Sequence, residues 1–179
     1  MSSYNVSSRY ARALIELAEE KNIYDKVIED VQTVYFTLKD SRELRVVLSS
    51  PIISEEKKKD ILSAIFDKYV GEDVGRFLAF VVDKGRVELL TEITRRILEI
   101  NDERQNIADV TLKSVIELDS AQVEKIKKAF EEYTGKKIRF KNILDESIIG
   151  GYVAQVKDKV FDASVKRQLE RLKETLIAN

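Results

Sequence analysis

Carboxylate pairs are the first candidates for chemistry in this chain, because two carboxyl groups can act together as general acid and general base. Several pairs of adjacent acidic residues occur, such as Glu19-Glu20, Glu55-Glu56, Asp102-Glu103 and Glu131-Glu132. Neighbouring residues of a helix point in different directions, so the two carboxyl groups of such a pair do not face each other. These pairs therefore indicate solvated helix surfaces rather than an active site.

The residue types that most enzymes rely on are missing. The 179 residues include no His and no Cys. The chain thus lacks the commonest general base, the commonest transition-metal ligand and the commonest activated nucleophile. We expect no catalytic residue, no metal site, no cofactor and no disulfide.

Phosphate and nucleic-acid chemistry is also poorly supported. The run Lys57-Lys58-Lys59 lies among Glu55, Glu56 and Asp60, which predicts a mixed surface rather than a phosphate site. The glycines form neither a P-loop nor a dinucleotide fingerprint. The 31 basic and 32 acidic residues give a net charge of −1. This balance gives no electrostatic reason to expect nucleic acid or an anionic membrane as the main partner.

Composition predicts a soluble, helical protein. No apolar run approaches the roughly 18 to 20 residues of a membrane-spanning helix, and the first residues lack the features of a signal peptide. With 44% apolar and 35% charged residues, six Gly and one Pro, the chain suits long amphipathic helices. We therefore expect no direct insertion into a membrane.

The first 105 residues show the helical period, with apolar residues recurring at spacings of three and four. Ser41 and Ser54 are candidate N-caps, Pro51 ends the third helix, and the glycines Gly71 and Gly85 separate later ones. These signals predict six antiparallel helices joined by short loops. We expect a six-helix bundle with its own core over residues 1–105.

The period changes between Asn101 and Ile107. From there, alternating apolar residues predict a strand over 109–116, a helix from about Asp119 to Gly135, and a further strand from about Ile138. Residues 1–105 hold 17 basic and 20 acidic residues, a net charge of −3, whereas 106–179 hold 14 and 12, a net charge of +2. We expect a mainly α protein whose second domain, 106–179, is a small α/β unit ordered strand-helix-strand-strand-helix.

The stretch from Ile148 to Ser164 is the most distinctive part of the chain. Gly150 and Gly151 permit a positive φ or a close approach of another backbone, which indicates a bulge or a tight entry to a strand. Apolar residues then alternate over 152–156, and Lys157-Asp158 can turn the chain into a short return at 159–161. Either Asp162 or Ser164 can cap the final helix, whose apolar stripe includes Val165, Leu169, Leu172 and Leu176.

Several segments together carry a family resemblance. They are Ser147-Ile-Ile-Gly-Gly, Asp158, Asp162-Ala-Ser-Val, Leu169-Glu-Arg-Leu, Arg9-Tyr-Ala-Arg-Ala-Leu, Ser50-Pro-Ile-Ile-Ser-Glu-Glu-Lys and Phe77-Leu-Ala-Phe-Val-Val-Asp-Lys-Gly-Arg. They resemble the delta subunit of bacterial F-type ATP synthases, whose mitochondrial counterpart is the oligomycin-sensitivity-conferring protein. The resemblance covers nearly the whole chain and marks Gly150, Gly151, Asp158, Asp162 and Ser164 as the structural signature of the C-terminal domain.

The resemblance implies a non-catalytic stator subunit of the peripheral stalk, present in one copy per complex on the cytoplasmic face of the bacterial cell membrane. It implies that the C-terminal domain meets the C-terminal end of the b subunits. It also implies that a groove between the first and fifth helices receives an N-terminal helix of an alpha subunit of the catalytic head. Core packing explains Ala13, Leu14 and Val81 equally well or better. The candidate groove lining consists of apolar residues on those two helices: Tyr10, Ala13, Leu14, Leu17, Phe77, Phe80 and Val81.

Two alternatives of other classes remain at this point. One is a free-standing helical adaptor or nucleic-acid binder, for which a steep salt dependence of binding would be diagnostic. The other is a small hydrolase that uses carboxylates alone, for which the sequence offers no converging site.

Overall fold

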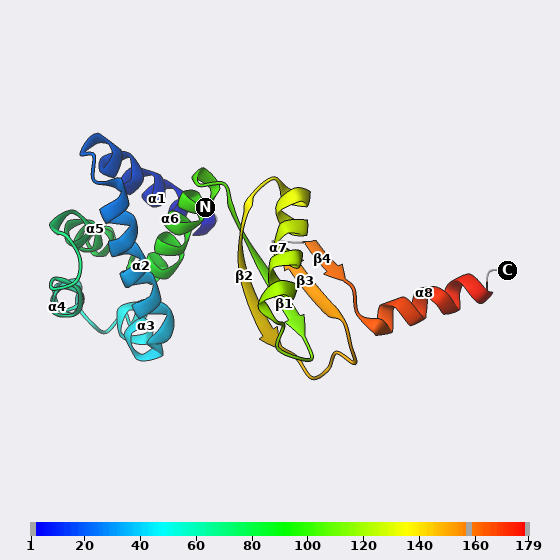
Figure 1. The fold of residues 1–179 in the computed structure, drawn as a ribbon. Coiled ribbons are helices and arrows are strands. Elements are labelled where there is room, and N and C mark those ends of the chain that lie inside the picture. Colours follow the sequence, from blue (N-terminus) through cyan, green and yellow to red (C-terminus); the bar gives the residue numbers. More distant parts are fainter. Residues whose placement is uncertain (1–2, 157–158, 178–179) are drawn as a thin grey trace. The chain divides into compact units, whose positions relative to one another are not determined.

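The chain is divided into two compact units. The structure, a computed structural model, describes residues 3–156 and 159–177. Its units are Met1–Asn101 and Asp102–Asn179 (Figure 1). The described residues are mainly helical, with a small four-stranded mixed sheet in the second unit. No helix in these residues is long and apolar enough to cross a membrane.

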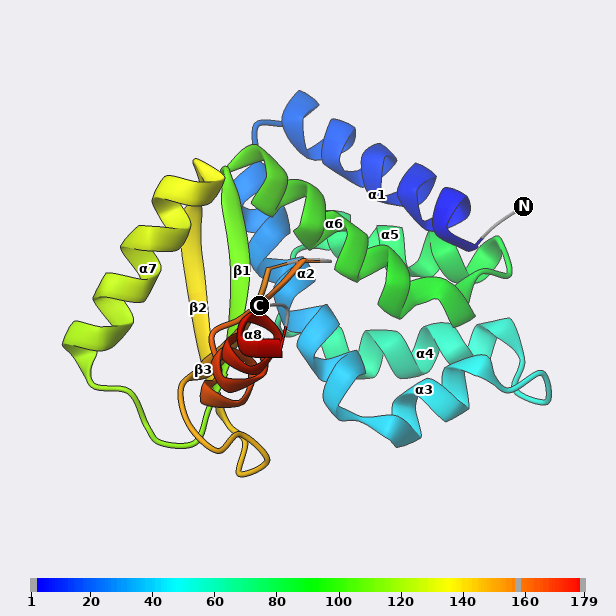
Figure 2. The ribbon, with the colours of Figure 1, turned by 90° about the vertical axis from the view of Figure 1, so that its right-hand side faces the viewer.

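Amphipathic helices build the first unit. Figure 2 shows α1 lying alongside α5 and α6, and aromatic contacts of Tyr10 with Phe80 and of Tyr4 with Arg96 join the same helices. Their bounds are α1 Ser3–Glu20, α2 Tyr24–Asp40, α3 Arg42–Ser49, α4 Glu55–Phe66, α5 Glu72–Asp83, the short 3-10 helix η1 Val87–Leu89, and α6 Leu90–Arg104.

Local signals explain where these helices begin. The Ser41 hydroxyl accepts a hydrogen bond from the backbone N–H of Leu44, and the Ser54 hydroxyl accepts one from Lys57. Each bond satisfies a backbone donor that the first turn of a helix leaves without a partner. Both residues are the N-caps that the sequence predicts.

One hydrophobic core unites all six helices and η1. Among its fully buried members are Leu14 on α1, Val34 on α2, Phe66 on α4, Val81 on α5 and Ile97 on α6. Burying a side chain of this size stabilises the fold by about 1.5 to 3 kcal/mol. Among the described residues, no apolar side chain beyond Ile100 belongs to this core, so the apolar packing of the first unit is complete without the second.

The second unit contains a sheet with one long helix on one of its faces. The strand order is β2-β1-β3-β4, with β1 parallel to β2 and antiparallel to β3, and β3 antiparallel to β4. Figure 1 shows α7 against this sheet and α8 leading away from it. The elements are β1 Ile107–Ser114, α7 Ser120–Thr134, β2 Lys137–Leu144, β3 Tyr152–Val156, β4 Lys159–Asp162 and α8 Val165–Ile177.

The predicted order of three strands and two helices is incomplete, because the described chain contains a fourth strand. The short return at 159–161 is β4, which pairs with β3 so that Ala154 lies opposite Phe161. With only four residues, three of them exposed, β4 gives a weak alternation signal, so sequence alone shows a return but not a strand.

Alternation along the strands divides the sheet into a buried and an open face. Ala108, Val110 and Leu112 of β1 are buried in the core with Phe130 of α7. The intervening residues of β1, such as Asp109, lie on the opposite face. The two hydrophobic cores share no residue, so each unit packs its own apolar side chains.

We therefore expect residues 1–105 to fold when expressed alone. The fragment retains every member of the first core, so its circular dichroism spectrum should be helical and its thermal unfolding cooperative. A fragment that is unfolded at 25 °C would show that the first unit depends on the second.

Candidate partner-binding sites

An apolar surface lies where α1 approaches α5. The rings of Tyr10 and Phe80 are 6.0 Å apart between centroids and tilted by 49°. The ammonium group of Lys84 lies over the Phe80 ring at 5.4 Å from its centroid. Phe80 remains 46% exposed despite both contacts, so much of its apolar surface is open to a partner.

The predicted groove residues fall into two sets. Tyr10 is half-buried, whereas Ala13, Leu17 and Phe80 are exposed. The three others lie in the core of the first unit and underlie the surface rather than line it: Leu14, Phe77 and Val81. We call the other four residues, Tyr10, Ala13, Leu17 and Phe80, the α1/α5 surface.

Polar contacts fix the ends of the two helices that carry this surface. Lys21, just beyond α1, forms an ion pair with Asp73 in the first turn of α5. The buried carboxylate of Asp30 on α2 accepts a hydrogen bond of 2.7 Å from the backbone N–H of Gly71, the N-cap of α5. Because Gly71 has no side chain to cap the helix, Asp30 takes that role from another helix, and its charge also suits the positive end of the α5 dipole.

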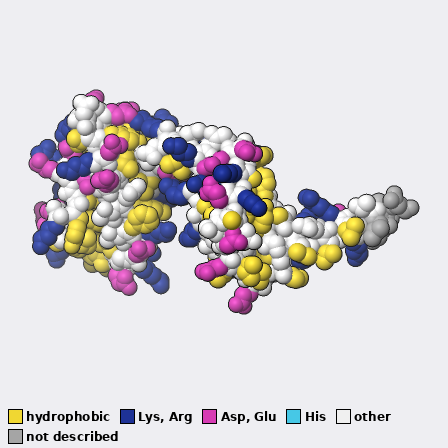
Figure 3. Space-filling model, in the orientation of Figure 1, with side chains coloured by type: hydrophobic (Ala, Val, Ile, Leu, Met, Phe, Trp, Pro, Cys, Tyr) yellow, Lys and Arg dark blue, Asp and Glu magenta, His cyan; other side chains and the backbone are white. Residues whose placement is uncertain are grey.

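A second apolar surface follows α8. The helix has no buried residue among those whose side chains are described. Val165, Leu169 and Leu172 recur at spacings of four and three, on one side of the helix, and all three are exposed. Figure 3 shows hydrophobic side chains gathered along α8. We call these three residues the α8 stripe.

An aromatic pocket of about 480 Å³ opens between α7, β4 and α8. Phe161 forms its centre, with edge-on ring contacts to Phe130 at 5.4 Å and Tyr133 at 5.2 Å between centroids. Its remaining lining is mostly apolar, with one charged residue of each sign: Ile126, Ala129, Tyr152, Val160, Asp162, Ala163 and Arg171. A pocket of this kind suits an apolar side chain of a protein partner.

The glycine pair brings the start of β3 against the β4–α8 junction. Gly151 has a φ of +77°, and a Cβ placed on it would lie 2.4 Å from the carbonyl oxygen of Ala163. A Cβ on Gly150 would lie 3.1 Å from the Val165 side chain, and the Gly150 carbonyl accepts a hydrogen bond from the Val165 N–H. The positive φ and the close backbone approach thus both occur at Gly151, while Gly150 anchors the first residue of α8.

The remaining signature residues cap α8. The Ser164 hydroxyl accepts a hydrogen bond from the backbone N–H of Arg167, which makes Ser164 the N-cap. Asp162 accepts a hydrogen bond from the Ser164 N–H at 2.9 Å. Hydrogen bonds from Ser164, aided by the charges of Arg167 and Arg171, lower the pKa of Asp162 below its ordinary value. Asp158 lies outside the described residues.

Sequence reasoning did not identify the aromatic pocket or the contacts that position α5. The Lys21–Asp73 and Asp30–Gly71 contacts join residues 52 and 41 positions apart, and no local pattern marks such pairs. The pocket had one signal in the sequence, the aromatic residues Phe130, Tyr133 and Phe161, which the alternation pattern treats as ordinary core.

Two separately packed units, each with an exposed apolar surface, are typical of a protein that joins other proteins. Comparisons with known proteins identify the family. A family model described as the ATP synthase delta (OSCP) subunit matches residues 6–176. This chain therefore belongs to the ATP synthase delta (OSCP) family, and it is a structural subunit rather than an enzyme.

Individual relatives agree over nearly the full length. The ATP synthase subunit delta of Chlorobaculum parvum is 39% identical over 178 residues, which cover 99% of this chain and 98% of that protein. The corresponding subunit of Acetivibrio thermocellus is 37% identical over 173 residues, 96% and 97% of the two chains. A chain in the Toxoplasma gondii mitochondrial ATP synthase hexamer matches with a TM-score of 0.70 at 27% identity, covering 97% of this chain and 98% of that one.

We expect Gly151→Ala to destabilise the second unit more than Gly135→Ala. Both glycines have a positive φ, but a Cβ at Gly135 meets nothing within 4 Å, whereas at Gly151 it meets the Ala163 backbone. Gly135→Ala should cost about 1 kcal/mol, from left-handed strain alone, and Gly151→Ala about 3 kcal/mol. Urea unfolding of both variants measures the difference, and equal costs would show that the Gly151 contact relaxes freely.

Proposed function

We propose that this subunit is the peripheral-stalk connector of an F-type ATP synthase, which links the catalytic head to the b subunits of the membrane sector. It acts as a stator: by holding the head still, it couples rotation to ion translocation and ATP synthesis. The observation that carries the proposal is that each of the two units leaves an apolar surface open, the α1/α5 surface on one and the α8 stripe on the other. A connector needs two such surfaces because it binds two partners.

The first unit binds the head through the α1/α5 surface. Its occupant is an amphipathic N-terminal helix of an alpha subunit, which covers Phe80, Tyr10 and Leu17 with its own apolar face. The six helices of this unit share one hydrophobic core, and the buried Leu14, Phe77 and Val81 support the surface from beneath. The Lys21 and Asp30 contacts hold α1 and α5 in place, so little freedom is lost on binding.

The second unit binds the C-terminal end of the b subunits. An isolated helix of 13 residues is only marginally stable in water, so the exposed α8 stripe gains most from a partner that covers it. The neighbouring aromatic pocket offers room for an anchoring side chain from the same partner. Arg171 at its margin adds a cation that favours an acidic partner residue.

Tethering explains how such contacts withstand torque. Once one unit is bound, the other meets its partner at a high effective concentration, because both partners belong to the same complex. Apolar contacts suit this role better than exposed ion pairs, each of which contributes only about 0 to 1 kcal/mol. One copy of the subunit serves one complex, on the cytoplasmic face of the bacterial cell membrane.

Phe80→Asp should weaken binding of a synthetic alpha-subunit N-terminal peptide by at least tenfold, because it replaces an apolar ring with a carboxylate in an apolar contact. Phe36→Asp is the matched control: Phe36 is 52% exposed, makes a tilted ring contact with Tyr35 and lies near the end of α2, but it is not part of the α1/α5 surface. Titration calorimetry gives the affinities, with circular dichroism as the check on helix content. Equal loss in both variants would exclude a specific role for the α1/α5 surface.

Leu169→Glu should uncouple the synthase without stopping hydrolysis. Leu169 is 60% exposed, and a charge there interrupts the α8 stripe, whereas Ile116, in the same unit and 61% exposed, lies outside it. In inside-out membrane vesicles the Leu169→Glu variant should hydrolyse ATP but pump ions several-fold less, and Ile116→Glu should do both normally. Loss of soluble-head hydrolysis in proportion to pumping would argue against a stator.

A further inference from the structure

The outer edge of β2 is an unused side of the sheet. β2 lies at one end of the strand order and has eight residues, twice as many as β4 at the other end. Among the strands that the structure describes, β1 alone pairs with it. The docking surfaces proposed above involve α1, α5, α7, β4 and α8, so none of them uses this edge.

Hydrogen bonding shows which groups face outward. The backbone N–H groups of Lys137 and Asp145 donate to β1-side carbonyls, Asn106 and Ser114, at 2.9 Å each. In a parallel pair, alternate residues direct both backbone groups toward the neighbour. The N–H and C=O groups of the intervening residues, Phe140 and Asn142, therefore point away from β1.

The first outward-facing N–H group of β2 already donates a hydrogen bond to a carboxylate. The backbone N–H of Ile138 donates to the Oε1 atom of Glu131 on α7 at 3.2 Å. This bond shows that a carboxylate can reach the edge from outside the sheet. The donors further along the strand have no such side chain over them in the described hydrogen bonds.

Cations line the open face of the same strand. Lys137, Arg139 and Lys141 alternate along it, and all three are exposed. The charge of Arg139 is already paired, because Asp102 and Asp109 each accept two hydrogen bonds from its guanidinium, at 2.5 to 3.2 Å. Lys137 and Lys141 form no ion pair with any residue that the structure describes.

The positive charge extends past the start of the strand. A depression of about 830 Å³ there is lined by Lys127, Lys136 and Lys137 together with the paired Arg139, and by one carboxylate, Glu131. The three lysines outnumber the single carboxylate of Glu131, so the lining of this depression is positive overall. A negatively charged segment along the edge would meet Lys137 and Lys141 on either side of Arg139, whose charge is already paired with Asp102 and Asp109.

Exposed lysines also protect strand edges from self-association. Two copies paired through β2 would bring cations against cations, and like charges opposite each other are destabilising. The same charges that exclude a second copy favour an acidic strand. A single-stranded nucleic acid is less suited, because no aromatic side chain of β2 lies on the open face to stack with bases.

We propose that the free edge of β2 binds an extended acidic segment of a partner protein, which joins the sheet as a fifth strand with carboxylates opposite Lys137 and Lys141. Strand residues four positions apart lie on one face and are separated by about 13 Å. A matching segment therefore carries acidic residues at positions i and i+4. Its backbone pairs with the outward groups of Phe140 and Asn142.

The test uses the ¹⁵N-labelled full chain and a capped seven-residue peptide of valine and threonine with glutamate at positions 2 and 6. The control peptide has the same composition with glutamates at positions 2 and 5, which places them on opposite faces. The first peptide should shift the amide signals of Phe140 and Asn142 and slow their hydrogen exchange. The control should bind at least fivefold more weakly.

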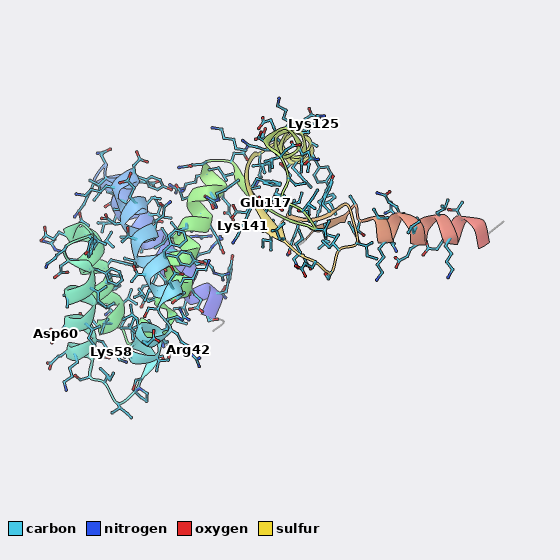
Figure 4. All side chains as sticks on the ribbon, turned by 60° about the horizontal axis from the view of Figure 1, so that its bottom comes forward. Arg42, Lys58, Asp60, Glu117, Lys125 and Lys141 are labelled. Atoms are coloured by element: carbon cyan, nitrogen blue, oxygen red, sulfur yellow. The ribbon has the colours of Figure 1, made fainter. Side chains whose placement is uncertain are left out.

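Lys141→Glu should lower the affinity for the first peptide about tenfold at low salt, because an opposite-charge pair becomes a like-charge pair. Lys125→Glu is the matched control, since it makes the same charge change on α7; Figure 4 shows Lys125 and Lys141 on different sides of the second unit.

The proposal is overturned if both peptides bind equally, if both variants lose equal affinity, or if the shifted amides lie on α8 rather than β2. It is also overturned if an oligonucleotide shifts the β2 amides and the acidic peptide does not. None of these results bears on the stator role, which the vesicle assays test independently.

Discussion

The close approach of Gly151 to the Ala163 backbone is the constraint on which the second unit depends. It brings the entry of β3 against the junction where β4 ends and α8 begins. The hydrogen bond from Val165 to the Gly150 carbonyl then fixes the first residue of α8. The direction in which α8 leaves the sheet, and hence the placement of its apolar stripe, follows from one position that only glycine fills without strain.

In the first unit the α1/α5 surface stays open to solvent while the helices that carry it are held in place. The core of this unit fills the space beneath α1 and α5, so the half-buried ring of Tyr10 and the exposed ring of Phe80 rest on close-packed side chains. Polar contacts are placed at the helix ends, where they supply caps and charges and do not interrupt the apolar surface. Asp30 illustrates this division, because its carboxylate is buried and satisfied by a helix terminus.

The sequence predicts most of the helices and the change of architecture near residue 101, because helical and alternating periods are local properties. It predicts the Ser41 and Ser54 caps for the same reason. It does not separate Leu14, which is buried, from Leu17, which is exposed, since both lie on the apolar side of α1. Such a distinction depends on how far neighbouring helices reach around α1, and tertiary packing alone decides that. The family resemblance rests on local motifs, which can be identified in the sequence without knowledge of the fold. The full-length relatives belong to the family that these motifs indicate.

The exposed α8 has a consequence for the subunit before it is assembled. Because none of the described side chains of α8 is buried, the helix opens at little free-energy cost, and an opened segment is readily cleaved by proteases. Under the proposed function a partner covers the apolar stripe, and the cost of opening then includes the binding free energy. The free subunit is then expected to be degraded faster than the assembled one, so that turnover removes surplus copies.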